Sequence, residues 1–300
     1  MRTTEGEGLK SEPLRAALRE ALAGRTELLE RMLLRYGAGP DPRPNLKLAA
    51  AFGDEMASDV DDSAARRLLQ RLGADDSAPD TREIFLPMAA AHGWVGRLRA
   101  RRDVEVAWAS LRDLAGDERI PVRVATLAAL RAYSLDRGRA GELVARGDEW
   151  LEGEDRELRF SAASVVVEVL AEHQALAGVP VFADALGYLS RAVAEAADAP
   201  RSAERSEGRR RLLVALPRAL ATAVAVGGEE GVAWLEAECT AAIKPNLRAA
   251  LAEAVIRVQA HSPVNGIRVR HALEGSAKPL RDPSRVRPGA GRGKSSRRSR

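Results

Sequence analysis

The chain has 300 residues, of which 45% are apolar, 30% charged and 4% aromatic, with 47 Lys and Arg against 43 Asp and Glu. A chain of this length and apolar content buries a sizeable core in one or two domains. Its single cysteine, Cys239, excludes a disulfide scaffold and an all-cysteine metal cluster within the chain. Residues 1–20 lack the apolar stretch of a secretory signal, and no window approaches the roughly 18 apolar residues of a membrane span. We therefore expect a soluble, cytoplasmic protein without a membrane partner.

The basic charge is concentrated at the end of the chain. Residues 275–300 hold nine Lys or Arg and one Asp, a net charge of +8, whereas residues 1–274 hold 38 basic and 42 acidic residues, a net charge of −4. The basic end is rich in Gly, Pro, Ser and Arg, a composition typical of disordered segments. We therefore expect a folded, mildly acidic domain over 1–274 and a disordered tail over 275–300. The tail residues that are candidates for a nucleic-acid tether are Arg292, Lys294, Arg297, Arg298 and Arg300.

Most of residues 1–274 has the periodicity of an α-helix. Apolar residues recur at three- and four-residue spacing, as in LRAALREAL (14–22) and AARRLLQRL (64–72), with polar residues grouped on the other face. Turns rich in Gly, Pro and Asp separate segments of roughly 10 to 20 residues. This pattern predicts an all-α protein.

Three of the predicted helices share one pattern, in which small or apolar residues follow a first apolar residue at offsets of 4, 7, 8 and 11. Three others are weaker copies of this pattern; in one of them Asp54 stands at an offset that should be apolar. We call these first residues the anchors. They are separated by 38, 38, 36, 54 and 35 residues, and a period of this size is typical of stacked helical repeats. The long interval indicates a loop extension at about 198–208. The anchors are Leu46, Ile84, Val122, Leu158, Leu212 and Leu247.

The turn and helix over 117–130, DERIPVRVATLAAL, resemble the second helix of a HEAT repeat, a helix pair of the armadillo-type α-solenoids. The resemblance is clear over 105–170 and 232–258 and fair over 40–100. It implies a right-handed solenoid of about six HEAT-like helix pairs, in which each pair buries its apolar faces against its neighbours.

The recurring polar residues of this pattern have expected structural roles. Asp117 and Asp155 are expected to cap the helices that follow them. Arg123 and Arg159 are expected to pair with acids of the adjacent repeat. Pro87 and Pro217 lie inside predicted helices and are expected to kink or shorten them.

No pattern of catalytic, metal-binding or cofactor-binding residues is present in the sequence. The four His are far apart in the sequence, and none has a partner at the spacing of a helical metal site. Gly293-Lys294-Ser295 lacks the upstream glycine of a phosphate-binding loop, because position 288 is Pro. Acidic clusters such as Glu229-Glu230 fall in turns and first helical turns, where acids favourably meet the helix dipole. We therefore expect no metal and no cofactor, and the sequence names no catalytic residue.

Two specific functions remain open, beside an enzyme whose catalytic residues the sequence does not name. The favoured one is a non-enzymatic scaffold or adaptor that binds a partner protein or peptide in the concave groove of the solenoid. The alternative is a nucleic-acid-binding protein, since some HEAT-like proteins are alkylpurine DNA glycosylases with aromatic side chains and a carboxylate at the lesion. The mildly acidic domain and the lack of any match to the glycosylase active-site motif argue against the alternative. The Trp residues, at 94, 108, 150 and 234, are interpreted as packing between repeats.

The densest basic run of the domain, RLRARR (97–102), is the candidate partner-binding patch. Basic residues there could face a partner or could simply be solvated at a helix end, where Arg meets the negative pole of the helix dipole. The candidate partner-binding residues are Arg97, Arg99, Arg101, Arg102 and Arg131.

Overall fold

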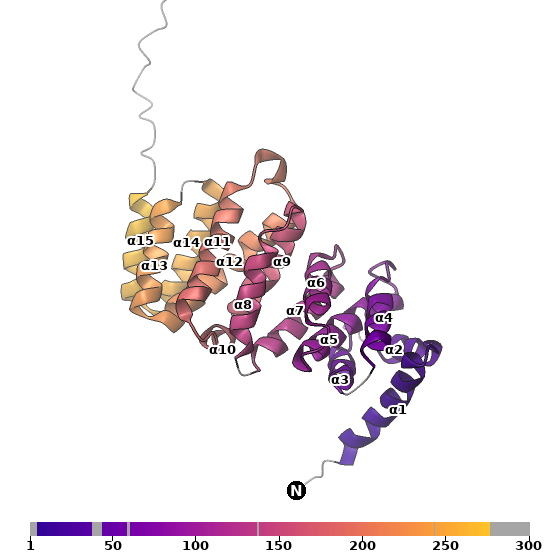
Figure 1. Cartoon of the computed structure of the whole chain (residues 1–300). Coiled ribbons are helices and arrows are strands. Elements are labelled where there is room, and N and C mark those ends of the chain that lie inside the picture. The colour runs from indigo at the N-terminus through magenta and orange to yellow at the C-terminus, as the bar shows by residue number, and fades with distance from the viewer. Residues whose placement is uncertain (1–4, 38–43, 59–60, 137, 243, 277–300) are drawn as a thin grey trace, which may run out of the picture.

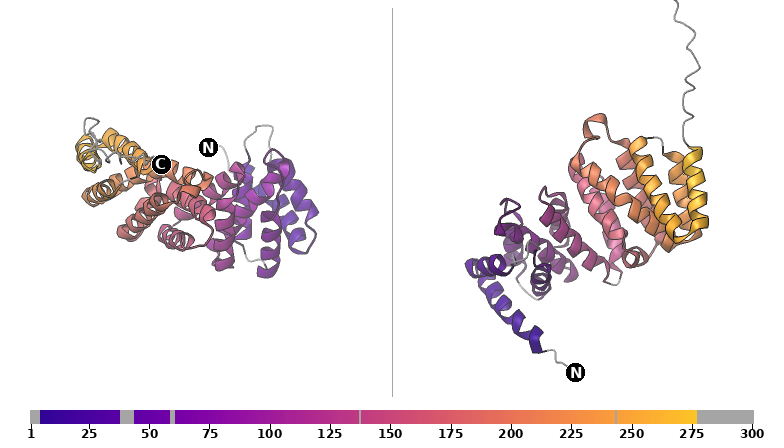
Figure 2. Two further views of the ribbon diagram at one scale, coloured as in Figure 1. Left: turned by 90° about the horizontal axis from the view of Figure 1, so that it is seen from above. Right: turned by 180° about the vertical axis from the view of Figure 1, so that it is seen from behind.

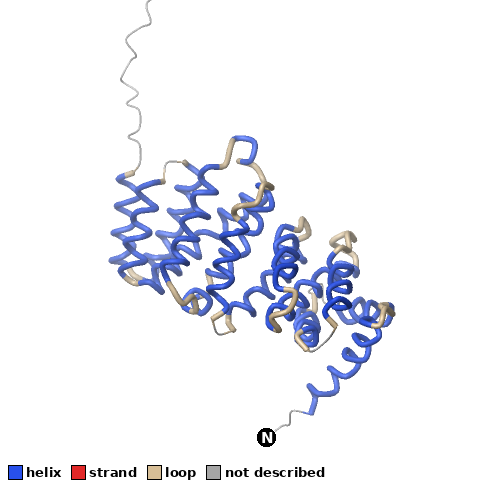
Figure 3. Tube along the Cα trace, viewed as in Figure 1, coloured by secondary structure: helices blue, strands red, loops and turns tan. Residues whose placement is uncertain are grey.

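The computed structural model describes residues 5–37, 44–58, 61–136, 138–242 and 244–276. Over these ranges the chain forms fifteen α-helices and two 3-10 helices and no β-strand (Figure 3). The all-α prediction is therefore confirmed for the described part. The predicted tail lies outside the described residues from position 277 onward, and with it all five of its candidate nucleic-acid contacts.

The helices follow one another with short connections. The first half contains α1 (Glu5–Leu22), α2 (Glu27–Gly37), α3 (Leu46–Met56), α4 (Asp62–Gly73), η1 (Arg82–Ile84), α5 (Phe85–Arg99), α6 (Val104–Gly116) and α7 (Ile120–Ser134). The second half contains α8 (Arg139–Trp150), α9 (Arg156–Leu170), α10 (His173–Ala177), α11 (Phe182–Asp198), η2 (Arg201–Ala203), α12 (Glu207–Gly227), α13 (Glu229–Ala241), α14 (Pro245–His261) and α15 (Pro263–Gly275).

Each anchor lies at or near the start of one helix of a continuous layer. The helices α3, α5, α7, α9, α12 and α14 pack one on the next in this order, and we call them the anchor layer. The helices that precede them, α2, α4, α6, α8, α11 and α13, complete six consecutive helix pairs, with α1 and α15 at the two ends (Figure 1). The predicted α-solenoid of about six pairs is confirmed. Its right-handed sense stays an implication of the HEAT resemblance.

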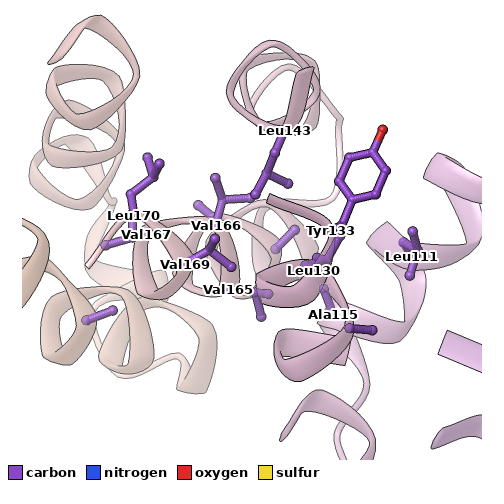
Figure 4. Packing of buried hydrophobic residues seen from close by; sticks show 14 of the residues in the cluster. Leu111, Ala115, Leu130, Tyr133, Leu143, Val165, Val166, Val167, Val169 and Leu170 are labelled. Atoms are coloured by element: carbon purple, nitrogen blue, oxygen red, sulfur yellow. The ribbon is translucent and has the colours of Figure 1, made fainter. Parts of the chain in front are cut away.

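The stack is elongated and changes direction near its middle. Figure 2 shows α1 and α15 at opposite ends of the body, with the remaining helices between them in chain order. Between α7 and α9 the second half turns relative to the first (Figure 1), and the outer helix α6 packs directly on α9. Figure 4 shows Tyr133, Leu143 and Val166 in the buried region where α7, α8 and α9 meet.

The long interval between the fourth and fifth anchors holds two additions to the repeat. One is the short helix α10, and the other is the connection over 199–206, which includes η2. The predicted loop extension at 198–208 is therefore shorter than expected, because α11 continues to Asp198 and α12 begins at Glu207.

Close packing of α3 on α5 depends on small residues. A Cβ placed on Gly96 would overlap the backbone oxygen of Gly53, and a Cβ on Gly53 would overlap the backbone oxygen of His92.

The two prolines expected to kink or shorten helices are both buried. Every residue of α5 from Phe85 to Leu98 is buried, including Pro87 in its first turn. A proline there breaks no helical hydrogen bond, since the first N–H groups of a helix have no partner within it. Pro217 is buried inside α12, which is 21 residues long, so the expected shortening is wrong for this helix.

The repeated arginines bind the turn that precedes their helix. Arg123, Arg159 and Arg248 each donate from Nη1 to the backbone carbonyl six residues earlier, at 2.6, 2.8 and 3.1 Å. Arg159 also pairs with Glu195 of α11 at 2.7 Å, as expected, whereas Arg123 binds the carbonyls of Asp117 and Glu118 instead of an acid. These charged donors satisfy carbonyls left free at the end of the first helix of a pair.

Of the two expected acidic helix caps, one is confirmed and the other is wrong. Asp155 caps α9 by accepting from the backbone N–H of Leu158. Asp117 does not cap α7; its carboxylate accepts from the backbone and side chain of Arg119. The two residues differ because α7 begins at Ile120, three residues after Asp117, whereas α9 begins directly after Asp155.

Three of the four tryptophans are buried, as the packing interpretation requires. Trp108 of α6 meets Tyr133 and Trp150 edge to face, at centroid distances of 5.4 and 6.0 Å. Trp234 is half-buried and its indole N–H donates to Ser190 at 2.8 Å. Trp94 lies in α5 of the anchor layer.

Candidate partner-binding surface on the anchor layer

Arg97 does not belong to an exposed basic patch. Its side chain is 0% exposed, donates to Asp103 at 3.1 Å and forms a second ion pair with Asp62. A third donor reaches the carbonyl of Met56 at 3.5 Å. Its assignment as a partner-binding residue is therefore corrected, because its donors are used inside the protein.

The other arginines of the 97–102 run are also paired with acids. Arg99 lies 2.8 Å from Asp136 and 3.3 Å from Asp54. Arg101, the most exposed of the run, pairs with Glu142 of α8. Arg102 lies 3.0 Å from Asp62. The run thus connects α5 to its neighbours, and its positive charge is largely offset; binding of a partner by Arg99, Arg101 and Arg102 stays a prediction.

Arg131 lies in a different environment, on the exposed face of α7. Its Nη2 is 3.4 Å from Oε1 of Glu172, and its Nε is enclosed without a hydrogen-bond acceptor. Arg218 of α12 reaches the same carboxylate oxygen at 2.8 Å. Glu172 follows α9, which lies between α7 and α12 in the anchor layer. Its carboxylate thus connects side chains of α7 and α12 across the helix between them.

Four arginines surround the exposed edge of α9. Arg123 and Arg131 come from α7, and Arg211 and Arg218 come from α12. Burial raises the pKa of Glu168 of α9, and the charges of Arg131, Arg218 and Arg123 act to lower it. Burial also lowers the pKa of Arg123 and Arg211. We call these residues, with Glu172, the arginine cluster.

Apolar side chains are exposed beside the arginine cluster. On α7 and at its end they follow one helical stripe: Ile120, which is 65% exposed, then Val124, the half-buried Leu127, and Leu135. On α12, Val214 is 77% exposed between Arg211 and Arg218. Contiguous exposed apolar side chains on a soluble protein are typical of an interaction site, whereas single ones are ordinary.

A hollow of about 550 Å³ lies at the end of this stripe. Its walls come from the end of α7, from Glu172 between α9 and α10, and from the start of α10. The lining residues are Arg131, Ser134, Leu135, Glu172, His173, Gln174 and Ala175. Of the five sequence-predicted domain residues, Arg131 alone lines it.

Two groups with reactive chemistry are buried elsewhere. Burial, with the charge of Arg99, lowers the pKa of His92 to about 4, and its Nε2 has no hydrogen-bond partner. Burial raises the pKa of Cys239 to about 12, so its thiol is protonated at neutral pH.

Among the described residues, no group of three or more His, Cys, Asp or Glu is placed to hold a metal ion. Within the same ranges, no helix combines the length and apolarity that crossing a membrane requires.

Comparison with known proteins adds one distant likeness. No family model matches the chain, and no curated protein matches it. A solved structure of a designed armadillo repeat protein is similar at 16% sequence identity, over 83% of this chain and 100% of that chain, with a TM-score of 0.30. At that TM-score the likeness carries no argument, and the assignment to an α-solenoid rests on how the helices pack. Membership of the HEAT family stays a prediction.

Several residues of this surface were missed from the sequence. Glu172 and Arg218 are 46 residues apart, and only the stacking of α9 and α12 brings them together. The sequence did, however, contain an indication of the exposed apolar side chains. Val124 and Val214 each lie two positions after an anchor, where a large apolar side chain falls outside the buried stripe.

Proposed function

We propose that the protein is a scaffold or adaptor without enzymatic activity, and that it binds a partner protein or peptide on the concave face between α7 and α12. The observation that carries the proposal is the exposed apolar stripe of α7, which leads to the hollow lined by Arg131 and Leu135, together with the exposed Val214 of α12. Burial of such side chains by a partner is favourable, at about 25 cal/mol per Å² of apolar area. Solenoids bind along surfaces of this kind.

The nucleic-acid alternative receives less support. Binding to duplex DNA depends on cations that neutralise several phosphates. The basic run of the domain pairs internally with Asp54, Asp62, Asp136 and Glu142, which leaves its charge offset. A tether through the tail and a cytoplasmic location both remain proposals from composition.

Site-specific photo-crosslinking tests the proposal. A benzophenone amino acid is placed at Val214 or at Val124 in cells that make the protein, and at Val181 as a matched control. Val181 is also an exposed valine, but it precedes the outer helix α11. We expect the same crosslinked protein from positions 214 and 124 and none from 181. Equal crosslinking at all three positions, or a crosslinked species that nuclease digests, would overturn the proposal.

A further inference from the structure

The last helix of the stack, α15, has one face that no other described helix covers. It packs on α13 and α14 and lies at the end of the body (Figure 2). Arg268 pairs with Glu229 and Glu236 of α13. Gly266 lies so close to Gln259 of α14 that a Cβ would overlap it. The remaining positions form one exposed helical stripe, directed away from both neighbours. They are Val264, Ile267, His271 and Glu274.

The first half of this stripe is apolar. Val264 is 70% exposed, and Ile267, one turn further on, is 46% exposed. Stacked helical repeats need terminal helices with a polar outer face to stay soluble. The helix at the other end, α1, has such a face. Its exposed side chains over 12–22 are Glu12, Pro13, Arg15 and Arg19. The C-terminal end of the stack is therefore the end that is suited to pack against a further helix.

The charged side chains around this apolar face balance one another. On α14, Glu253 and Arg257 pair at 2.6 Å. On α15, Arg270 and Glu274 carry opposite charges, and Arg270 also donates to Gln259 of α14. A highly charged partner, such as a nucleic acid, would gain no net attraction from this face. A second copy of the same face would meet no net repulsion.

We propose that the exposed face of α15 is a self-association site, at which two copies of the chain form an end-to-end dimer. The site lies outside the face between α7 and α12 and goes beyond the proposed function. In an interface with two-fold symmetry each residue meets its counterpart reciprocally. An axis beside α15, between Val264 and Ile267, makes the two helices antiparallel and packs each Ile267 on Val264 of the second copy.

The apolar area at this end predicts a weak dimer. Besides the two side chains of α15, Ile256 of α14 is 63% exposed one turn before Gln259. Together the three side chains expose roughly 200 Å² per copy, at about 100 Å² for a fully exposed Val or Ile. A standard interface buries about 800 Å² per partner, of which a little over half is apolar. We therefore expect a dissociation constant on the order of 100 µM.

A dimer of this kind has a consequence for binding. It contains the face between α7 and α12 twice, in one assembly. A partner with two binding segments would therefore be held more tightly by the dimer than by one chain, because its second segment binds at a raised effective concentration.

Sedimentation equilibrium of the nuclease-treated full chain tests the association, over about 5 to 500 µM because the dimer population depends on protein concentration. We expect a monomer–dimer equilibrium. The Val264→Ser/Ile267→Ser variant is expected to weaken association by at least about 100-fold, since each dimer loses both side chains twice. Val181→Ser is the matched control, because Val181 is also an exposed valine but precedes the outer helix α11. Circular dichroism verifies the helical fold of each variant.

Disulfide crosslinking under mild oxidation tests the geometry. The native Cys239 is buried and does not compete. Val264→Cys lies next to the two-fold axis and is expected to link two chains. Glu274→Cys is the control on the same stripe. Its two copies would lie about 25 Å apart, at about 1.5 Å per helical residue, which is too far for a disulfide.

Four outcomes would overturn the inference. They are a monomer at every concentration, association that the Val264→Ser/Ile267→Ser variant does not weaken, growth beyond the dimer, and crosslinking of Glu274→Cys as readily as of Val264→Cys. Association lost in a Val124→Ser/Val214→Ser variant instead would place the second copy on the face between α7 and α12, which also overturns it. A monomer leaves the proposed function in place, because that proposal concerns a different surface.

Discussion

Arg97 and Asp103 form an ion pair enclosed by the protein, with Nη2 of Arg97 3.1 Å from Oδ2 of Asp103 and side chains that are 0% and 2% exposed. Asp103 stands just before α6 in a left-handed conformation, at φ 50°, and also pairs with Arg66 of α4. Arg97 comes from the end of α5. The carboxylate of Asp103 thus connects three helices at the turn between two repeats. Because it is buried, its negative charge must be paired with the two arginines, Arg66 and Arg97, for the fold to be stable.

Replacement of Arg97 by Met is expected to destabilise the protein strongly. The substitution keeps most of the side-chain volume but leaves the enclosed carboxylate of Asp103 with Arg66 as its remaining cation, a change that costs about 3 kcal/mol in buried pairs. Urea denaturation followed by circular dichroism measures the change. Arg101→Gln is the control, since Arg101 is exposed and its pair with Glu142 is expected to contribute less than about 1 kcal/mol. Similar losses for the two variants would contradict this account of the basic run.

Arg159 provides a test of the repeated arginine. Its Nη1 donates to the carbonyl of Gly153 and its Nη2 pairs with Glu195, so Arg159→Gln removes one charged hydrogen bond and one ion pair. We expect a loss of about 1 to 3 kcal/mol in the free energy of unfolding. The exposed neighbour Arg156 is the control, and its substitution by Gln is expected to change stability by less than about 0.5 kcal/mol. Equal effects would mean that the repeated arginine has no special role.

The anchors located the helices correctly because burial itself produces the apolar period. Val122, Leu212 and Leu247 are buried in the anchor layer, and a side chain buried on one helical face leaves a trace in the sequence at fixed offsets. Arg97 leaves no such trace. Arg97 pairs with Asp62, which is 35 residues away in the sequence, and only the packing of α4 on α5 brings the two side chains together.

The proposed binding surface was only partly predictable for the same reason. Arg131 was a candidate from its charge, and it does line the hollow. Its relation to Arg218 depends on how α7, α9 and α12 pack on one another, because both side chains reach Glu172 after α9. The local period of any one helix contains no information on that packing, so the sequence indicated a groove without its lining.

Gly96→Ala tests the close approach of α3 and α5. A Cβ at this position meets the backbone of Gly53, which has no flexible side chain to move aside, and overpacking of this kind costs about 1 to 3 kcal/mol. Gly187→Ala is the matched control, because a Cβ on this exposed glycine of α11 meets nothing within 4 Å. The control is expected to be more stable than the parent by about 0.5 to 1 kcal/mol. Thermal unfolding of both variants gives the comparison, and stabilisation by both would show that the helices do not pack this closely.

His92 is expected to make stability depend on pH. Its pKa is about 4 in the folded protein, against 6.5 for an exposed histidine, because burial disfavours the charged ring. Between these two values the unfolded chain binds more protons than the folded one, so the free energy of unfolding falls as the pH is lowered from about 7 toward 4. At pH 5 the loss amounts to about 2 kcal/mol.

Urea denaturation at pH 7.5 and pH 5.0 measures this loss, and His92→Gln is expected to be less stable at pH 7.5 but to lose most of the difference between the two pH values. His173→Gln is the control, because His173 is exposed and its substitution is expected to keep the full difference. A difference that persists in His92→Gln would place the pH dependence on other groups and would mean that the imidazole of His92 reaches solvent.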